Sequence, residues 1–380
     1  MKRLNVLVYF GLIPLTAGFS PPIAADTGTS SVRVQLEQRL TTLDGVGVLG
    51  SVLSVTTPGQ QPITVHHGFA DIERKEAITE SHLFQIGSQT KMFTAAAILL
   101  LHDRGQLDVD DLVSKYVASV PHPESLRIRH LLLHLGGIGD GIKFFDPPLG
   151  RWPDFEVTFE NHLFLGRVAG EEFAPGERWS YNNLGYVILG KVAEAATRQP
   201  LDRFVREEIL EPLAMNETWL GNLEAYPESR MARGYFVEDT TGATIDTTKP
   251  DLSWASSAGD MVSSLGDLRR WAQALLDENN AVGLDLEDFS RQAVAVPGAG
   301  NLVRYGFGMM QRKVGAKAFW GHGGFIQGYV TLTLVEPSSG IILQLLANLT
   351  DDSEEVIPAL EAVAADALAI AGFASRDSLR

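Results

Sequence analysis

The sequence has no cysteine among its 380 residues. This absence excludes disulfides, thiol nucleophiles and thiol-linked lipid anchors. A chain of this length buries enough apolar surface to fold without cross-links, as one large domain or two ordinary ones. The hydrophobic content of 45%, with 37 glycines and 18 prolines, indicates a folded globular protein with many loops.

Positive charge is also scarce. The chain has 31 lysines and arginines against 47 acidic residues, which gives a formal net charge of −16. An acidic surface opposes binding to nucleic acid and to anionic membranes. We therefore expect neither as a partner. Internal repeats and low-complexity tracts are absent from the sequence as well.

Long hydrophobic runs are missing beyond the N-terminus. Lys2 and Arg3 precede a mostly apolar run over 4–19, and 21–25 reads Pro-Pro-Ile-Ala-Ala. This layout predicts a signal peptide over 1–25, with cleavage after Ala25 and a net charge of −18 afterwards. A membrane anchor is disfavoured, because the run contains Pro14 and falls short of about 20 apolar residues. We expect an exported, periplasmic or secreted protein without an integral membrane segment after signal removal.

Hydrophobic periodicity predicts strands at both ends of the chain and helices between them. The pattern indicates one α/β unit, about 30–87 and 255–375, split by a helical part over about 88–254, so that 26–380 forms a single domain. Expected helices are one built on Val32, Leu36 and Leu40, then 107–112, 128–135, 184–196, 201–213, 265–276 and 356–371. Expected strands are 46–56, 63–69, 306–311, 318–321, 328–335 and 341–349, with a hairpin turn at 337–340.

The first motif with chemical meaning is Ser88-Gln-Thr-Lys91, which opens the apolar run 92–101. A helix that is apolar all round lies inside a domain, and burial disfavours the charged form of a lysine. A lysine driven toward neutrality one turn from a serine hydroxyl is a general base beside a nucleophile. The alternative reading is a serine at a helix start followed by an ordinary helical lysine.

The second motif, Tyr181-Asn-Asn183, follows a Pro-Gly-Glu turn. The two side chains point the same way if this piece is extended. A phenol beside Lys91 would lose its proton more easily and act as a base, and the amide of Asn183 can hold a substrate carbonyl. Alternatively, Asn183 caps the predicted helix 184–196 and Tyr181 is an aromatic residue of the core.

The third motif is His322-Gly323-Gly324-Phe325, at the end of a predicted strand. Glycines there allow a ligand to approach the backbone closely. His322 can bind a substrate carboxylate or assist proton transfer. The alternative is an ordinary strand end with a satisfied histidine.

In this order and spacing, the three motifs resemble the serine β-lactamase and penicillin-binding protein superfamily. Tyrosine in the middle motif is similar to the branch of class C β-lactamases and D-alanyl-D-alanine carboxypeptidases. The resemblance spans about 46–350 and implies an α/β (α+β) fold, with an antiparallel sheet flanked by helices and a large helical insertion. Two departures stand out: His322-Gly323-Gly324 replaces Lys-Thr-Gly, as in D,D-carboxypeptidases and D-aminopeptidases, and 135–137 reads Leu-Gly-Gly where relatives often have Thr-Ser-Gly.

The resemblance implies an acyl-enzyme formed on Ser88, with Lys91 and Tyr181 sharing the base work. The backbone N–H groups of Ser88 and Phe325 would hold the oxyanion. Asn183 would bind the substrate amide. We expect a peptide or small-molecule substrate, D,D-carboxypeptidase-like activity on D-amino-acid peptides, amides or esters, and no cofactor.

Other functions stay open at this point. A β-lactamase, a carboxylesterase or a non-catalytic peptide-binding protein could use the same fold, and the loops 144–151 and 235–248 that shape specificity carry no readable code. His130 and His134, spaced as zinc ligands on a predicted helix, suggest a metallohydrolase. No glutamate follows the first histidine and no third ligand is evident, so we expect no metal. The sequence leaves the oligomeric state open.

Overall fold

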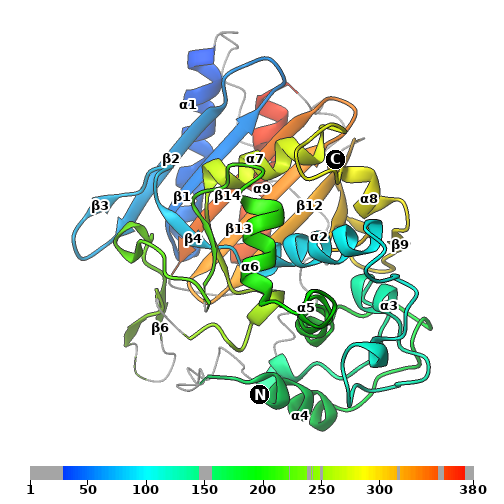
Figure 1. The fold of residues 1–380 in the computed structure, drawn as a ribbon. Coiled ribbons are helices and arrows are strands. Elements are labelled where there is room, and N and C mark those ends of the chain that lie inside the picture. Colours follow the sequence, from blue (N-terminus) through cyan, green and yellow to red (C-terminus); the bar gives the residue numbers. More distant parts are fainter. Residues whose placement is uncertain are drawn as a thin grey trace.

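The computed structural model describes residues 29–144, 156–221, 223–237, 241, 243–248, 251–314, 317–349 and 355–372 (Figure 1). The predicted signal peptide and most of the loop 144–151 lie outside these ranges. Within them, no helix is long and apolar enough to span a bilayer.

The fold is built on a nine-stranded antiparallel sheet that joins the two ends of the chain. The strand order is β3-β2-β1-β14-β13-β12-β11-β10-β9. The N-terminal strand β1 pairs with the last strand β14, Val52 opposite Leu346. The strands are β1 Val48–Thr56, β2 Ile63–Asp71, β3 Glu76–Ala77, β9 Val294–Ala295, β10 Leu302–Tyr305, β11 Met310–Val314, β12 Lys317–Ile326, β13 Tyr329–Glu336 and β14 Ile341–Leu349.

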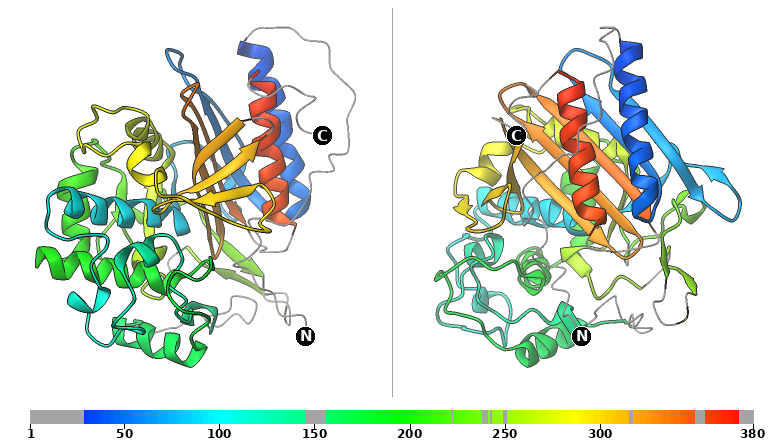
Figure 2. Two further views of the ribbon diagram at one scale, coloured as in Figure 1. Left: turned by 90° about the vertical axis from the view of Figure 1, so that its right-hand side faces the viewer. Right: turned by 180° about the vertical axis from the view of Figure 1, so that it is seen from behind.

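Helices cover both faces of this sheet (Figure 2). On one face α1 (Thr29–Leu40), continued by η2 (Thr41–Val46), packs beside α9 (Val356–Ile370). Leu36, Leu343 and Leu360 belong to the apolar cluster beneath them. Against the other face lie α7 (Leu265–Leu275) and the helical region. Both faces are covered, which is why β14 is buried along its whole length.

The helical region is centred on α2 (Thr90–Asp103), which is buried from Thr90 to Leu101. Around it are α3 Ile128–Leu132, α4 Phe159–Ala169, α5 Asn183–Thr197, α6 Leu201–Val205, α8 Leu286–Ser290, the π-turn η7 Arg206–Leu210 and the 3₁₀ turns η3 Gly87–Gln89, η4 Val113–Lys115, η5 Gly141–Phe144, η8 Glu228–Arg230 and η9 Ser256–Ala258. A small sheet is made of β4 Leu83–Gln85, β8 Met261–Ser264 and β5 Thr218–Leu220, and a hairpin of β6 Tyr235–Val237 and β7 Thr244–Asp246. The mixed fold with an antiparallel sheet is the expected one.

Two local predictions were wrong, and one helix was missed. Of the expected strand 306–311, residues 306–309 form a turn between β10 and β11, and only Met310 and Gln311 belong to a strand, at the start of β11. The turn is closed by the bond from Gly306 N to Met309 O (2.7 Å), and Gly308 has φ 72°. The expected helix 107–112 is a series of turns, because Asp108 accepts from the backbone N–H of Asp110 (2.9 Å) in place of a helical carbonyl. The helix α4 was not expected at all.

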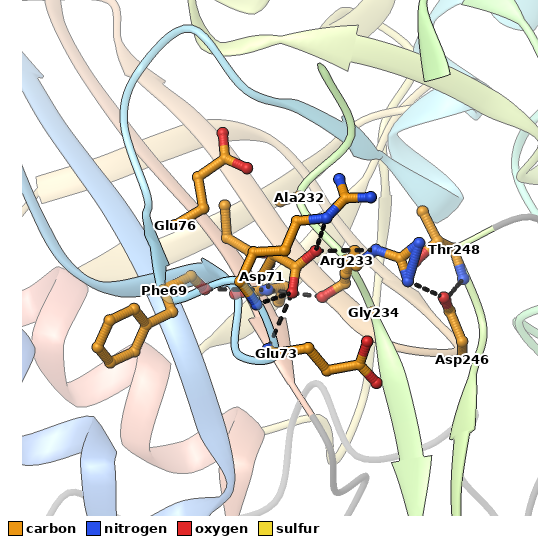
Figure 3. A network of polar contacts seen from close by, with 12 residues as sticks. Phe69, Asp71, Glu73, Glu76, Ala232, Arg233, Gly234, Asp246 and Thr248 are labelled. Atoms are coloured by element: carbon orange, nitrogen blue, oxygen red, sulfur yellow. Dashed lines mark hydrogen bonds and ion pairs between the residues drawn. The ribbon is translucent and has the colours of Figure 1, made fainter. Parts of the chain in front are cut away.

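An ion-pair network fastens the end of β2 to the chain before β6 (Figure 3). The Arg233 guanidinium lies between the carboxylates of Asp71 and Asp246, with 3.2 Å from Nε to Asp71 Oδ2. Asp71 also accepts from the backbone N–H groups of Glu73 and Arg74, each at 2.9 Å. The bond from Arg233 N to Ala70 O (2.7 Å) completes the junction.

Candidate active site

Ser88 lies on a tight connection between the small sheet and the buried helix. β4 ends at Gln85, η3 carries Ser88, and α2 begins at Thr90. Gly87 has φ 52°, and a Cβ there would come within 3.0 Å of Phe325 N, so glycine suits both the turn and the close approach to β12. Ser88 is partly exposed while Gly87 and Gln89 are buried. The hydroxyl is therefore the part of this connection that a substrate can reach.

Lys91 is completely buried, and its Nζ lies within hydrogen-bond distance of three oxygen atoms. Its Nζ lies 3.0 Å from Ser88 Oγ, 2.8 Å from Asn183 Oδ1 and 2.7 Å from the carbonyl oxygen of Ala258. Burial lowers the pKa of Lys91 to about 7, against an opposing effect of Asp140. A neutral amine keeps two N–H donors and one lone pair. Because the amide and carbonyl oxygens only accept, the lone pair is left for the Ser88 hydroxyl.

Tyr181 lies over the same lysine, with Lys91 Nζ 5.0 Å from its ring centroid. The Ser88 side chain lies close enough to its hydroxyl to act on the pKa of the phenol. The sequence motif predicted a lowered pKa for this phenol, and that prediction was wrong. Burial raises the pKa of Tyr181 above its ordinary value, although the neighbouring Ser88 side chain works in the other direction. Tyr181 is therefore a proton donor near neutral pH, and Lys91 is the better base.

Asn183 is the first residue of α5 and is buried. Asn182, not Asn183, caps the helix, with its Oδ1 accepting from Gly185 N at 2.8 Å. The Asn183 side chain uses Oδ1 for Lys91 and Nδ2 for Asp140 Oδ2 (3.1 Å). Its contacts lie within the protein, and the expected contact to a substrate amide stays a prediction.

His322 points into the protein and is fully buried. Nδ1 donates to the carbonyl oxygen of Gly323 (2.5 Å), which leaves Nε2 to accept from the hydroxyl of Tyr305 (3.2 Å). Burial, with Lys91 and Arg312 nearby, lowers the pKa of His322 to about 3. The imidazole is therefore neutral over the physiological range, and it brings no positive charge to a substrate carboxylate.

The glycines of the third motif let β12 run against the Ser88 turn. A Cβ on Gly324 would lie 1.8 Å from the carbonyl oxygen of Ile86, so no other residue fits without displacing that backbone. β11 pairs with β12 only as far as Gly321, and past this point the edge of β12 has no strand beside it on the β11 side within the described chain. Gly323, Gly324 and Phe325 follow along this edge, while the Phe325 side chain packs in the apolar cluster under α1 and α9. The oxyanion role of its N–H stays a prediction.

An aromatic cluster that the sequence did not predict surrounds His134. Its ring centroid lies 4.3 Å from that of Tyr181 and 4.4 Å from that of Tyr305. His134 has φ 57° and lies beyond α3, which ends at Leu132, and its Nδ1 accepts from Asn182 N at 3.1 Å. The suggested zinc pair on one helix was wrong for this reason. Among the described residues, no group of three His, Asp or Glu is placed to bind a metal ion.

The Leu135-Gly136-Gly137 departure has a structural role. Gly137 has φ 64°, and a Cβ there would lie 2.0 Å from the carbonyl oxygen of Phe173. Backbone bonds join Glu172 N to Gly137 O and Gly176 N to Leu135 O, each at 2.8 Å. The segment thus docks the loop that leads to Tyr181.

Known proteins resemble this chain over most of its length. The model of the family described as Beta-lactamase matches residues 36–367. Penicillin-binding protein 4* of Bacillus subtilis (strain 168) is 28% identical over 310 residues, which cover 77% of this chain and 67% of that protein. Protein flp of Staphylococcus aureus (strain NCTC 8325 / PS 47) is 26% identical over 320 residues, covering 82% and 61%. The chain thus spans about two thirds or less of the length of these relatives.

The similarity to solved structures extends over almost the whole length of those proteins. The D-amino acid amidase from Ochrobactrum anthropi SV3, complexed with D-phenylalanine, has a TM-score of 0.80 and 28% identity, covering 90% of this chain and 99% of that one. A D-stereospecific amidohydrolase from Streptomyces sp. has a TM-score of 0.72 and 27% identity, covering 87% and 98%.

Proposed function

The chain belongs to the beta-lactamase family, whose fold is that of serine hydrolases, and we propose that Ser88 is its nucleophile. The observation that carries this proposal is the bond from fully buried Lys91 to Ser88 Oγ, with both other Lys91 contacts made to oxygens that only accept. A lysine with a pKa of about 7 is half neutral near pH 7. Base and nucleophile are thus already in hydrogen-bond contact.

The proposed reaction runs through an acyl-enzyme. Ser88 Oγ bonds to the substrate carbonyl carbon as its proton passes to neutral Lys91, and the N–H groups of Ser88 and Phe325 hold the oxyanion. Collapse breaks the bond to the leaving group, which takes a proton from Tyr181, itself recharged from Lys91. Water then attacks the ester carbonyl carbon and gives its proton to Lys91. The bond from that carbon to Ser88 Oγ breaks, and Lys91 returns the proton to Oγ, which releases the acid and the free serine.

We propose D-amino-acid amides and peptides, or related carboxyl esters, as substrates. The similarity to the D-amino acid amidase and the D-stereospecific amidohydrolase supports this substrate class, because each of them aligns with this chain over almost its whole length. Neutral, buried His322 also lacks the charge with which a lysine would hold the carboxylate of a penicillin. Export by the predicted signal peptide is part of the proposal and is consistent with a cell-wall peptide as substrate.

β-Lactam hydrolysis is the second candidate, favoured by the similarity to Penicillin-binding protein 4*. The two candidates differ in kcat/KM, measured with one preparation on D-phenylalanine amide, L-phenylalanine amide, a phenyl ester and penicillin G. We expect turnover of the D-amide or the ester above that of penicillin. Faster hydrolysis of penicillin G than of every amide and ester would make this protein a β-lactamase.

The nucleophile is tested by intact-protein mass spectrometry after treatment with a fluorophosphonate. We expect one adduct on the parent and none on Ser88→Ala. Ser114→Ala is the matched control, because the Ser114 hydroxyl is bonded to the carbonyl oxygen of Pro123 and takes no part in the site. An adduct that persists in Ser88→Ala would refute the assignment.

A further inference from the structure

Asp140, which the sequence analysis did not single out, lies buried behind the site. It follows α3, one residue before η5, and only 5% of it is exposed. Its Oδ2 accepts from Asn183 twice, from the backbone N–H at 2.9 Å and from Nδ2 at 3.1 Å. Its Oδ1 accepts from Ile142 N at 3.2 Å. In the described part of the chain, Asp140 forms no direct ion pair.

These contacts fix which way the Asn183 amide faces. An ionised carboxylate only accepts hydrogen bonds, so Asn183 must turn its NH₂ group toward Asp140. The amide oxygen then faces Lys91 and accepts from Nζ at 2.8 Å. The reverse orientation would set an amide oxygen against a carboxylate and an NH₂ against the amine donors. Asp140 therefore determines the acceptor that Lys91 meets on this side.

The carboxylate of Asp140 also carries the charge that raises the pKa of Lys91. The other titratable groups around Lys91 are Tyr181, Tyr186, His134 and His322. Burial raises the pKa of both tyrosines and lowers that of both histidines, so all four are neutral near pH 7. The charge of Asp140 also raises the pKa of Tyr181 and works against burial at His162, whose pKa burial lowers.

We infer that Asp140 is a positioning residue of the proposed hydrolase, which orients Asn183 toward Lys91 and sets the electrostatic field at the base through one intervening carboxamide. This inference rests on the proposed function. Its negative charge favours the protonated amine, so removing that charge lowers the pH at which Lys91 becomes a base. Losing the amide orientation also slows the reaction when the base is neutral.

The test is the rate of fluorophosphonate labelling of Ser88 from pH 5 to 9 in the parent, Asp140→Asn, Asp140→Glu and Asp267→Asn. Asp267 is the matched control: it is fully buried and accepts from Glu217 N and the Thr218 hydroxyl, but it belongs to α7 and does not contact the site. If Asp140→Asn does not fold, Asp140→Ser removes the same charge and keeps a hydroxyl acceptor. Circular dichroism verifies folding.

The parent rate should rise through about pH 7. In Asp140→Asn the midpoint should fall by about one pH unit, the size expected for a charge one side chain away, with a plateau about tenfold lower. Asp140→Glu should keep the parental midpoint, and so should Asp267→Asn. An unchanged midpoint in Asp140→Asn or Asp140→Ser, with the parent reactive, overturns the inference and leaves the function standing. A parent that is never labelled on Ser88 overturns the proposed function, and this inference with it.

Discussion

Two basic side chains in this molecule meet carboxylates in opposite ways. Arg233 is one-third exposed and lies directly between Asp71 and Asp246 (Figure 3). Lys91 is buried and separated from Asp140 by the amide of Asn183. Direct pairing fastens two segments of the chain together. Separation leaves the burial cost of the ammonium only partly offset, and the lysine can release its proton near pH 7.

The comparison implies that the Lys91 arrangement serves reactivity at the expense of stability. Its disruption should therefore abolish chemistry, whereas disruption of the Arg233 network should change stability slightly.

The largest effect should come from Ser88→Ala. The nucleophile and its base act as a unit, so we expect a loss of at least about 10⁴-fold in kcat/KM with an unchanged circular dichroism spectrum. Steady-state kinetics on the best accepted substrate provide the measurement. Activity within about tenfold of the parent would be incompatible with a nucleophilic Ser88.

Lys91→Arg should be nearly as harmful as Lys91→Ala, with about 10²- to 10⁴-fold lower kcat/KM. A guanidinium keeps its proton and cannot serve as a base. The same substrate and enzyme concentrations as for Ser88→Ala allow direct comparison. An active arginine variant would mean that Lys91, like Arg233, contributes only a fixed charge.

The burial of Lys91 should make the unfolding free energy of the protein depend on pH. The pKa falls from 10.5 in the unfolded chain to about 7 in the folded protein. The unfolded state therefore binds more protons between these values, and this residue's contribution to stability rises with pH across that window. Below pH 7 Lys91 is charged in both the folded and the unfolded state, and its burial then destabilises the folded protein by the full amount.

Urea unfolding of the parent and of Lys91→Met at pH 6 and pH 9 measures this effect. Between pH 6 and pH 9, the unfolding free energy of the parent should rise by about 2 to 3 kcal/mol relative to that of Lys91→Met. This estimate follows from a slope of about 1.36 kcal/mol per pH unit above the folded pKa. If the difference in unfolding free energy between the two proteins is the same at both pH values, Lys91 has an ordinary pKa.

The smallest effect should come from Arg233→Met. The pair with Asp246 is 33% and 40% exposed, and the buried carboxylate of Asp71 keeps its hydrogen bonds from the backbone N–H groups of Glu73 and Arg74. We therefore expect a loss of about 1 kcal/mol in unfolding free energy and no change in the pH dependence of kcat/KM. Urea unfolding and a pH–rate profile report the two quantities. A displaced pH midpoint would contradict the separation of the two regions.

Much of the fold and of the site was predictable because the signals are local. β14 has the bounds that its apolar run predicts, and the hairpin turn 337–340 lies between β13 and β14 as expected. The predicted resemblance to the serine β-lactamase superfamily is confirmed. Ser88 and Lys91 are three residues apart, so helical geometry alone brings their side chains together.

The remaining features depend on contacts between distant segments. Asp140 stands between two glycines in a loop, and its partner Asn183 is 43 residues away. The pKa direction of Tyr181 was predicted wrongly, because the sequence shows the neighbouring lysine but not the burial that outweighs it. The expected strand 306–311 was placed four residues too early for a related reason: Phe307 and Met309 reach the core from a turn, which apolar residue types alone do not distinguish from a strand.

The central claim, that Lys91 is a base near neutral pH, is tested most directly by its own titration. Nitrogen-15 NMR of protein labelled at lysine, with Lys91→Arg to assign the resonance, follows the amine from pH 5 to 10. We predict a midpoint of about 7 for Lys91. A Lys91 resonance that titrates near 10.5 would contradict the account.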